Sequence, residues 1–207
     1  MSIDYAIQAE VIDIRVDKPK QDDSFLVDTN VWFWLTYTRA SQSATLSQIA
    51  HYPNYIAKAV SKKSKLFHCG LSIAELAHLI EETERELFEQ SVCPVKPKEY
   101  RHNYKTERVD VVAEIQTAWS QVKNMSASID LLIDKVATEK VLSELISYAI
   151  DGNDLFILEA VSKAGLYQII TDDGDFGTIP NIQVFTANQT VIRKAQSQGK
   201  LRNRDKP

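Results

Sequence analysis

The sequence predicts an α/β protein whose mostly parallel central sheet is covered by helices on both faces. Short apolar runs rich in Val, Ile, Leu and Phe alternate with longer amphipathic stretches, which is the pattern of βαβ units. These runs stop at acidic or polar residues, as strands do where they turn into helices. The 207 residues, 44% of them hydrophobic, are enough for one large domain or for a small domain with an insertion.

The first 90 residues are expected to begin with an extension at 1–23, before the main domain at 24–199. Alternation of apolar and polar residues predicts strands, and longer amphipathic stretches predict helices. The expected elements are an edge strand within 11–16, a linker at 18–23, a strand at 24–28, a helix from about 30, a helix to about 63 with Pro53 in its first turn, a strand at 65–69 and a helix at 72–90.

The second part of the chain is expected to hold a helical insertion at about 91–150, after which the βαβ pattern resumes. Gly165 suits the position that ends a helix. The expected elements are a loop at 91–110, helices at 109–122 and 127–150, a helix at 154–164, a strand at 166–170, a turn at 172–177, a strand at 182–185, a helix at 188–198 and a basic, frayed tail at 200–207.

The composition says more about where the protein is expected in the cell than about which partners it binds. The net charge of −4, from 24 basic and 28 acidic residues, argues only weakly against a nucleic-acid partner, because a few clustered carboxylates would account for it. Two cysteines give neither a disulfide framework nor a zinc motif. The N-terminus lacks signal-peptide features, and no apolar run approaches the ~20 residues that cross a bilayer. We therefore expect a cytoplasmic protein without a membrane partner.

Four short acidic motifs carry the chemistry. Their acidic residues are Asp28, Glu75, Asp154 and those of the run Asp172-Asp173-Gly174-Asp175. Each places a carboxylate at the end of a predicted strand or in the first turn of a predicted helix. An open α/β sheet gathers such positions in one crevice, where carboxylates repel one another unless a cation neutralises them. The pattern indicates a divalent-metal site and phosphodiester hydrolysis.

Each motif also has a simpler structural interpretation. Asp28 can cap the helix that follows it, and Asn153 or Asp154 can do the same for a later helix. Ser72 and Glu75 have the spacing of a capping box, which taken alone is the better interpretation. The run at 172–175 differs, because three carboxylates within four positions repel one another without a counter-ion.

Taken together, the motifs resemble those of the PIN-domain nuclease family. The matching segments are Val27-Asp28-Thr29-Asn30, Glu75-Leu76-Ala77, Asp154 to Ala160, and Thr171-Asp172-Asp173 with Asp175-Phe176, which together frame residues 24–188. The stretch at 91–150 is longer than in the compact toxin-type members.

The resemblance implies a Rossmann-like three-layer fold and a Mg²⁺- or Mn²⁺-dependent endoribonuclease. By analogy, the catalytic and metal-binding acids are Asp28, Glu75, Asp154 and Asp173, with Asp175 as a fifth metal ligand, and Asp172 is the variable position of its motif. Thr171 is then a hydroxyl beside the acids and Asn30 a support residue. Implied partners are an RNA substrate, a second copy of the chain in a homodimer and, in a toxin role, an antitoxin protein.

Residues outside these motifs have weaker predictions. The basic residues Lys98, Arg101 and Lys105 are candidates for RNA binding, with Tyr100 and Tyr104 beside them, although a solvated loop is the simpler interpretation. Aromatic residues at 32–34 suit a core or a dimer face. His78 is interpreted as an ordinary helix-face residue.

Two other functions stay open. A phosphatase of the haloacid-dehalogenase type needs a second Asp two residues after the first, and Asn30 occupies that place. A catalytically inactive PIN module acting in protein or RNA assembly would keep the fold without the chemistry.

Overall fold

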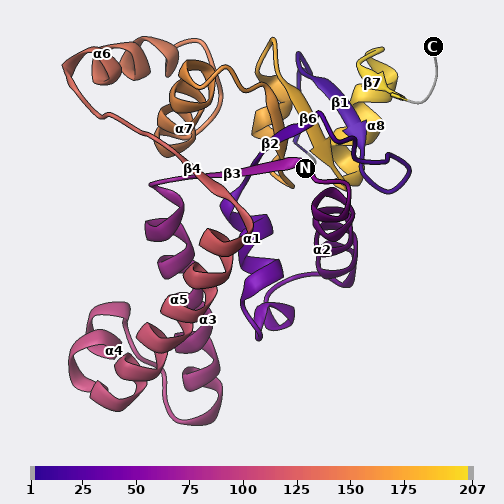
Figure 1. Cartoon of the computed structure of the whole chain (residues 1–207). Coiled ribbons are helices and arrows are strands. Elements are labelled where there is room, and N and C mark those ends of the chain that lie inside the picture. The colour runs from indigo at the N-terminus through magenta and orange to yellow at the C-terminus, as the bar shows by residue number, and fades with distance from the viewer. Residues whose placement is uncertain (1–2, 205–207) are drawn as a thin grey trace.

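The computed structural model describes residues 3–204 and confirms the predicted fold class. Within these residues a seven-stranded sheet has the order β4-β3-β2-β5-β6-β1-β7, and every neighbouring pair of strands is parallel. Helices lie on both faces of the sheet (Figure 1). The strands are β1 (Glu10–Asp13), β2 (Ser24–Val27), β3 (Lys65–Cys69), β4 (Ala127–Ile129), β5 (Gln168–Ile170), β6 (Gln183–Thr186) and β7 (Leu201–Arg202).

Eight α-helices and two short 3₁₀ helices connect the strands in the described part of the chain. The α-helices are α1 (Thr29–Thr36), α2 (Leu46–Ser61), α3 (Ser72–Ser91), α4 (Pro97–Asn103), α5 (Lys105–Met125), α6 (Lys135–Glu144), α7 (Gly152–Lys163) and α8 (Gln189–Ser197); the 3₁₀ helices are η1 (Ala40–Gln42) and η2 (Asp175–Thr178). None of the helices in residues 3–204 is long and apolar enough to cross a bilayer.

Alternation of side chains along the strands builds the three layers. In β2, Phe25 and Val27 pack in one core with α1, α2, α3 and α5, whereas Leu26 packs in a second core with α6 and α7. The same division separates Ile170 from Ile169 on β5. Because successive side chains of a strand face opposite ways, each central strand contributes to both cores. All five of these side chains are at most 2% exposed.

The chain changes direction across the sheet between β2 and β5. From β2 it proceeds outward to β3 and β4, whereas from β5 it proceeds the other way to β6. Neighbouring strands whose connections leave in opposite directions form a topological switch point, and the crevice at their carboxyl ends is where such sheets bind ligands. Asp28 follows β2 and Thr171 follows β5, so two of the acidic motifs begin at this crevice.

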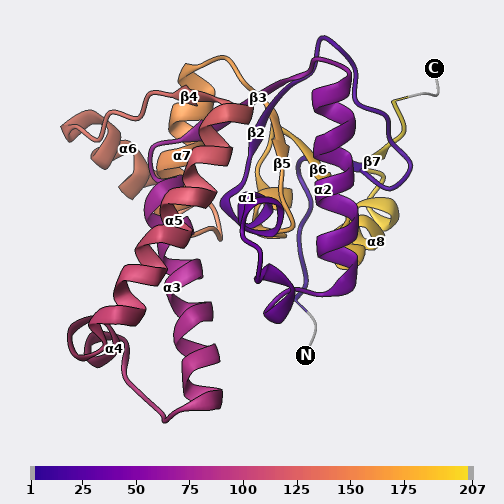
Figure 2. The same cartoon turned by 60° about the horizontal axis from the view of Figure 1, so that its bottom comes forward.

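An arm made of α3, α4 and α5 extends away from the sheet. Both views show α3 and α5 side by side with α4 across their far end (Figure 1, Figure 2). The arm has a small core of its own, in which Val95, Tyr100 and Val111 are buried against Phe88 and Tyr104. The predicted loop at 91–110 is therefore wrong for most of its length, because Pro97 begins a helix instead of ending one and Tyr100 faces inward.

Two other helix predictions also differ from the structure. Pro53 lies inside α2, which begins at Leu46 with Thr45 and Gln48 as a capping box, so the proline was assigned to the wrong turn. The predicted helix at 127–150 begins instead with strand β4, which pairs with β3 at one edge of the sheet. The helix of this segment, α6, starts after its N-cap Asp134.

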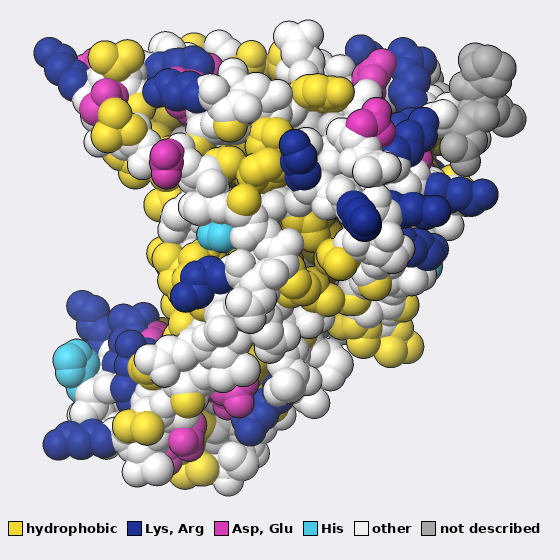
Figure 3. All heavy atoms as spheres, in the orientation of Figure 1, with side chains coloured by type: hydrophobic (Ala, Val, Ile, Leu, Met, Phe, Trp, Pro, Cys, Tyr) yellow, Lys and Arg dark blue, Asp and Glu magenta, His cyan; other side chains and the backbone are white. Residues whose placement is uncertain are grey.

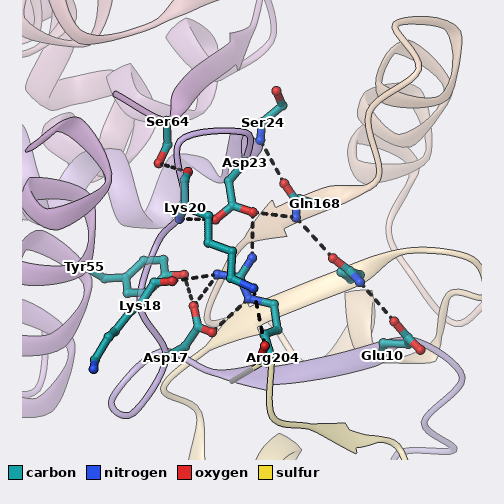
Figure 4. Close-up of polar contacts among 11 residues, drawn as sticks. Glu10, Asp17, Lys18, Lys20, Asp23, Ser24, Tyr55, Ser64, Gln168 and Arg204 are labelled. Carbon is teal, nitrogen blue, oxygen red and sulfur yellow. Dashed lines mark hydrogen bonds and ion pairs between the residues drawn. The ribbon is translucent and has the colours of Figure 1, made fainter. Parts of the chain in front are cut away.

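The two ends of the described chain are held more firmly than expected. Strand β1 is not at an edge, because it has β6 on one side and β7 on the other. The tail, expected to fray, forms β7, and Arg204 makes ion pairs with Asp17 and Asp23 (Figure 4). Residues 205–207 of the predicted tail lie outside the described residues.

Candidate active site at the carboxyl ends of β2 and β5

The four predicted acids line one cavity of about 220 Å³. They come from separate parts of the chain: the end of β2, the first turn of α3, the first turn of α7 and the segment after β5. The described residues that line this cavity are Asp28, Thr29, Asn30, Glu75, His78, Leu79, Asp151, Asn153, Asp154 and Asp173. The sequence motifs and the fold therefore agree on one location.

Asp28 lies at the centre of the site and also caps α1. Its Oδ1 accepts a hydrogen bond from the Thr29 backbone N–H at 2.6 Å, and its Oδ2 accepts one from the Thr171 hydroxyl at 2.6 Å. Burial raises the pKa of Asp28 to about 7, and the charges of Asp173 and Glu75 add to this rise while the two hydrogen bonds oppose it. The capping and the site interpretations of Asp28 are therefore both compatible with its position.

Glu75 does not take part in a capping box. The N-cap of α3 is Leu71, which makes no side-chain cap hydrogen bond, and Ser72 is already inside the helix. Glu75 Oε2 instead accepts a hydrogen bond from the Thr29 hydroxyl at 2.6 Å. Burial raises the pKa of Glu75, and the nearby charge of Asp151 acts in the same direction. The spacing with Ser72 was misleading, because α3 begins one residue earlier than a capping box would require.

The pKa of Asp154, like that of Asp28, is strongly raised. Burial raises the pKa of Asp154 to about 8, followed by the charges of Asp28, Asp151, Asp173 and Glu75. Its carboxylate has no capping role, because the N-cap of α7 is Asp151, whose Oδ1 accepts from the Asp154 backbone N–H at 3.0 Å. This frees the Asp154 side chain for the cavity.

Asp151 is the acid that the sequence reasoning missed. It lines the cavity, and its charge raises the pKa values of Glu75, Asp154 and Asp173. Its signal in the sequence was an Asp directly before Gly152 and three residues before another Asp, which is the spacing of an N-cap and its third helical residue. His78, to which the sequence gave no role, also lines the cavity from an exposed position on α3.

Thr171 connects the segment after β5 to Asp28. This fully buried hydroxyl donates to Asp28 and accepts from the Asp173 backbone N–H at 2.9 Å. Burial raises the pKa of Asp173, an effect that the Asp175 N–H opposes and the charges of Asp151 and Asp172 strengthen. The predicted placement of Thr171 beside the acids therefore agrees with its contacts.

The other two acids of the run face different surroundings. Asp172 accepts hydrogen bonds from the Tyr52 hydroxyl at 2.6 Å and the Gln48 amide at 2.7 Å, which ties the segment to α2. Asp175 does not line the cavity of the four acids but a neighbouring one, together with Tyr5 and Tyr148. Asn30, the predicted support residue, lines the first cavity.

Carboxylate oxygens are suitable ligands for a hard divalent cation, but the carboxylates of this cavity are not arranged as a coordination sphere. The described residues lining the cavity include five carboxylates and no Lys or Arg, so burial and mutual repulsion are not balanced by a side-chain cation. In residues 3–204, however, no group of three or more His, Cys, Asp or Glu side chains is arranged so that it could hold a metal ion. Hydrogen bonds from the chain hold oxygens of Asp28, Glu75 and Asp173 instead.

The candidate RNA-binding residues lie on the arm. Lys98 and Lys105 are exposed, and Figure 3 shows Lys and Arg side chains gathered at its lower left, over α4. Arg101 and Arg108 both pair with Glu81 of α3 and line a further cavity with His78, which also lines the acid cavity. The charge of Glu81 offsets these two arginines, and α3 itself carries six glutamates and one arginine, so the basic residues of the arm are concentrated around α4. Tyr100 is buried in the arm and is not free to stack on a base.

Comparison with known proteins does not name a family for this chain. No family model matches it, and no curated protein matches its sequence. The resemblance to PIN-domain nucleases stays a prediction that rests on the four motifs.

Proposed function

We propose that this protein is a divalent-metal-dependent endoribonuclease of the PIN-domain type. The observation that carries the proposal is the meeting of Asp28, Glu75, Asp154 and Asp173 in one cavity at the switch point of a parallel sheet. These acids are far apart in sequence, and folding brings them together at a cost in desolvation and repulsion. Perturbed pKa values that cluster in a crevice are typical of functional sites.

The acids divide into two roles. Asp28 and Asp173 are the residues that would hold Mg²⁺ or Mn²⁺, since they follow the two adjacent central strands. Bound there, the ion would supply Lewis-acid stabilisation of the charge on a scissile phosphate. Glu75 and Asp154 orient the attacking water and accept its proton, a task for which carboxyl groups with raised pKa values are suited.

Thr29 and Thr171 position these carboxylates. Each hydroxyl donates to a site carboxylate, Thr29 to Glu75 and Thr171 to Asp28. A donor of fixed direction leaves the remaining lone pairs of the acceptor free for a ligand. Because water is the attacking group in this proposal, the reaction needs no Ser, Cys or His nucleophile.

RNA is the proposed substrate because of the motif resemblance and the basic residues around α4. Lys98 and Lys105 are exposed there, whereas Arg101 and Arg108 are paired with Glu81. The toxin role with an antitoxin partner and the homodimer are part of the same proposal and rest on the resemblance alone.

A second candidate is an inactive α/β module that binds RNA or protein without cutting. The observation that favours it is the hydrogen bonding of the site carboxylates to the chain in place of an arrangement ready for an ion, among residues 3–204. Metal binding separates the two candidates, because only the nuclease needs it.

The test measures metal binding and RNA cleavage in the same variants. We expect Mg²⁺ or Mn²⁺ to raise the melting temperature, since a ligand at 100 times its Kd stabilises the folded state by about 2.7 kcal/mol. Asp28→Asn combined with Asp173→Asn should abolish this rise and the cleavage of single-stranded RNA, whereas Asp22→Asn with Asp130→Asn, both exposed, should change neither. If the first double variant keeps the full metal-induced rise in melting temperature, the proposed site is wrong. If the wild-type protein shows neither a metal-induced rise nor RNA cleavage, it is the inactive module.

Glu75→Gln tests the second role. This change keeps the acceptor for the Thr29 hydroxyl but removes the charge. The expected result is a folded protein that still binds the metal and has lost at least 100-fold in cleavage rate. Wild-type cleavage by this variant would remove Glu75 from the catalytic set.

A further inference from the structure

Tyr5 of the N-terminal extension packs directly on the segment that carries Asp173 and Asp175. A Cβ atom built on Gly174 would lie 2.3 Å from Tyr5 Cζ and 2.5 Å from the Tyr5 hydroxyl, so a side chain at this position would collide with the ring. Gly174 thus permits an approach that other residues would block. The hydroxyl end of Tyr5 therefore lies over the peptide that joins the two acids.

The backbone of Tyr5 is held in place from α8. The Gln198 side chain accepts a hydrogen bond from the Ile7 backbone N–H at 2.8 Å and donates one to the Tyr5 carbonyl at 2.8 Å. Gln198 is the C-cap residue of α8, and Lys194 of the same helix forms an ion pair with Asp4. These two side chains hold the backbone on both sides of Tyr5, and the contact with Gly174 places its ring beside the acids.

Tyr5 lines a second cavity of about 270 Å³ next to the site of the four acids. Its other polar and aromatic lining residues are Gln8, Ser147, Tyr148, Asp175, Thr178 and Asp4, which is paired with Lys194. Asp173 lines the first cavity and Asp175 the second, so one short loop is shared by both. A ligand that crosses the acid cavity can therefore place a neighbouring group in the second one.

The lining of the second cavity has the chemistry of a nucleobase site. Two phenol rings offer flat apolar faces on which a base can stack, and single-stranded RNA is commonly held in this way. The Asp175 carboxylate accepts hydrogen bonds and donates none. Guanine presents two adjacent N–H donors at its Watson–Crick edge. Adenine and cytosine each present one amino group beside an acceptor, and uracil presents one N–H between two carbonyls, so guanine is the base that a carboxylate matches.

The Tyr5 hydroxyl is available to the ligand. It makes no hydrogen bond to any residue within 3–204, although it lies at the acid loop. A tyrosine hydroxyl is protonated at neutral pH, so it can donate a hydrogen bond to a ligand.

We propose that this cavity binds one nucleobase of the RNA, guanine by preference, and thereby sets the position of the cut relative to the acid cavity. Tyr5 is the stacking residue, Asp175 the acceptor for the base edge, and Tyr148 a second aromatic residue of the lining. This inference rests on the proposed nuclease function for the cutting step, but the binding of the base does not require cleavage.

The experiment compares four short single-stranded RNAs that differ at one position, which is G, A, C or U within an otherwise uniform sequence. Cleavage is followed with Mg²⁺, and binding is followed by fluorescence polarisation in EDTA, where no cleavage occurs. The variants are Tyr5→Ala, Tyr5→Phe and Asp175→Asn. The matched control is Tyr167→Ala, because Tyr167 is 53% exposed and precedes β5 at the end of the sheet opposite the site.

We expect wild-type protein to bind and cut the G-containing RNA at least tenfold better than the other three. Tyr5→Ala should weaken binding to this RNA by about 5- to 100-fold, the usual loss when one base–aromatic stack is removed. Tyr5→Phe should keep most of the binding, and Asp175→Asn should lose the preference for G while still binding RNA. Tyr167→Ala should behave as wild type.

Each failure has a separate meaning. Cleavage without base preference, unchanged in Tyr5→Ala, overturns the base site and leaves the nuclease standing. Binding that prefers G and depends on Tyr5, without any cleavage, supports the base site and overturns the nuclease. If Tyr5→Ala does not fold, as judged by its melting transition, Asp175→Asn and Tyr5→Phe decide: unchanged G preference in Asp175→Asn overturns the proposal.

Discussion

The Thr29 hydroxyl donates a 2.6 Å hydrogen bond to the Glu75 carboxylate and so joins the first turn of α1 to the first turn of α3. The backbone N–H of the same residue donates to Asp28. One threonine therefore contacts two of the site acids and holds them on adjacent elements. Thr29 is only 3% exposed, so solvent does not compete for its hydroxyl.

Removal of this hydroxyl should lower activity without unfolding the protein. Thr29→Val keeps the shape and the backbone bond to Asp28 but leaves Glu75 without its donor. We expect RNA cleavage to fall roughly tenfold with a loss of about 1 kcal/mol in unfolding free energy. Steady-state kinetics and urea denaturation measure both, and Thr29→Ser should restore the rate. An unaltered rate in Thr29→Val would show that the position of Glu75 is not set by Thr29.

Stability without metal should decrease as pH rises from about 4 to about 8. The pKa values of Asp28 and Asp154 are raised in the folded state to about 7 and about 8. Below pH ~4 both groups are protonated in the folded and unfolded states alike. Above this pH the unfolded chain loses its protons first, so the folded state is progressively disfavoured until its own groups ionise, and the loss then stops.

Asn substitutions should remove this loss of stability. Because Asn stays neutral, Asp28→Asn and Asp154→Asn should each be more stable than wild type by about 2 kcal/mol at pH 8.5 in EDTA and nearly equal to it at pH 4. Urea denaturation at the two pH values measures the difference, with Asp22→Asn as an exposed control. Equal destabilisation of the variants at both pH values would mean that ionisation of these carboxylates does not lower the unfolding free energy of the wild type.

Arg204 should be essential for stability although it lies far along the chain from its partners. It pairs with Asp17 and Asp23, whose side chains are 3% and 5% exposed (Figure 4). Its guanidinium lies 4.7 Å from the centre of the Phe185 ring. Arg204→Ala leaves two buried carboxylates without a cation, which typically costs about 3–5 kcal/mol. The matched control is Arg202→Ala, because Arg202 pairs with Glu10 at the surface and is 52% exposed. Thermal unfolding of both variants tests this, and equal melting temperatures would contradict it.

The basic residues of the arm should govern the salt dependence of RNA binding. Replacing Lys98, Arg101 and Lys105 together by Ala removes up to three phosphate contacts, so the slope of log K against log salt should flatten by about 2. Metal binding should stay intact, since none of the three residues lines the acid cavity. If the slope is unchanged, the phosphates are bound elsewhere, and the arm becomes a candidate surface for a second copy of the chain.

The central strands and the acids could be predicted from sequence because local patterns determine them. The apolar runs before Asp28 and Thr171 are buried on both faces of the sheet, so they are continuous and easy to recognise. Ser72 and Glu75 show the opposite case: their spacing indicated a capping box, but the contact of Glu75 with Thr29 comes from the packing of α1 on α3. Long-range contacts of this kind leave no local signal.

The errors in the insertion and the tail have the same cause. The segment at 127–129 is predicted to begin a helix because the stretch from 127 to 150 has apolar residues at helical spacing, whereas pairing with β3 makes it a strand. Arg204 gave no sign in the sequence of its partners Asp17 and Asp23, which lie more than 180 positions earlier. Tyr5 likewise reaches the acid loop only through the folded chain.

The position of β1 between β6 and β7 has a consequence for the order in which the molecule assembles. During synthesis, β2 and β3 can pair early, whereas Glu10 must wait for Gln183 and the Tyr5 carbonyl for Gln198, 193 positions later. Contacts this distant along a chain form slowly, because a long loop must close before they stabilise anything. The segment around β1 is thus among the last to dock, and refolding should recover the sheet centre before the cavity beside Tyr5. A partly folded molecule would then gather its acids before it could select a base.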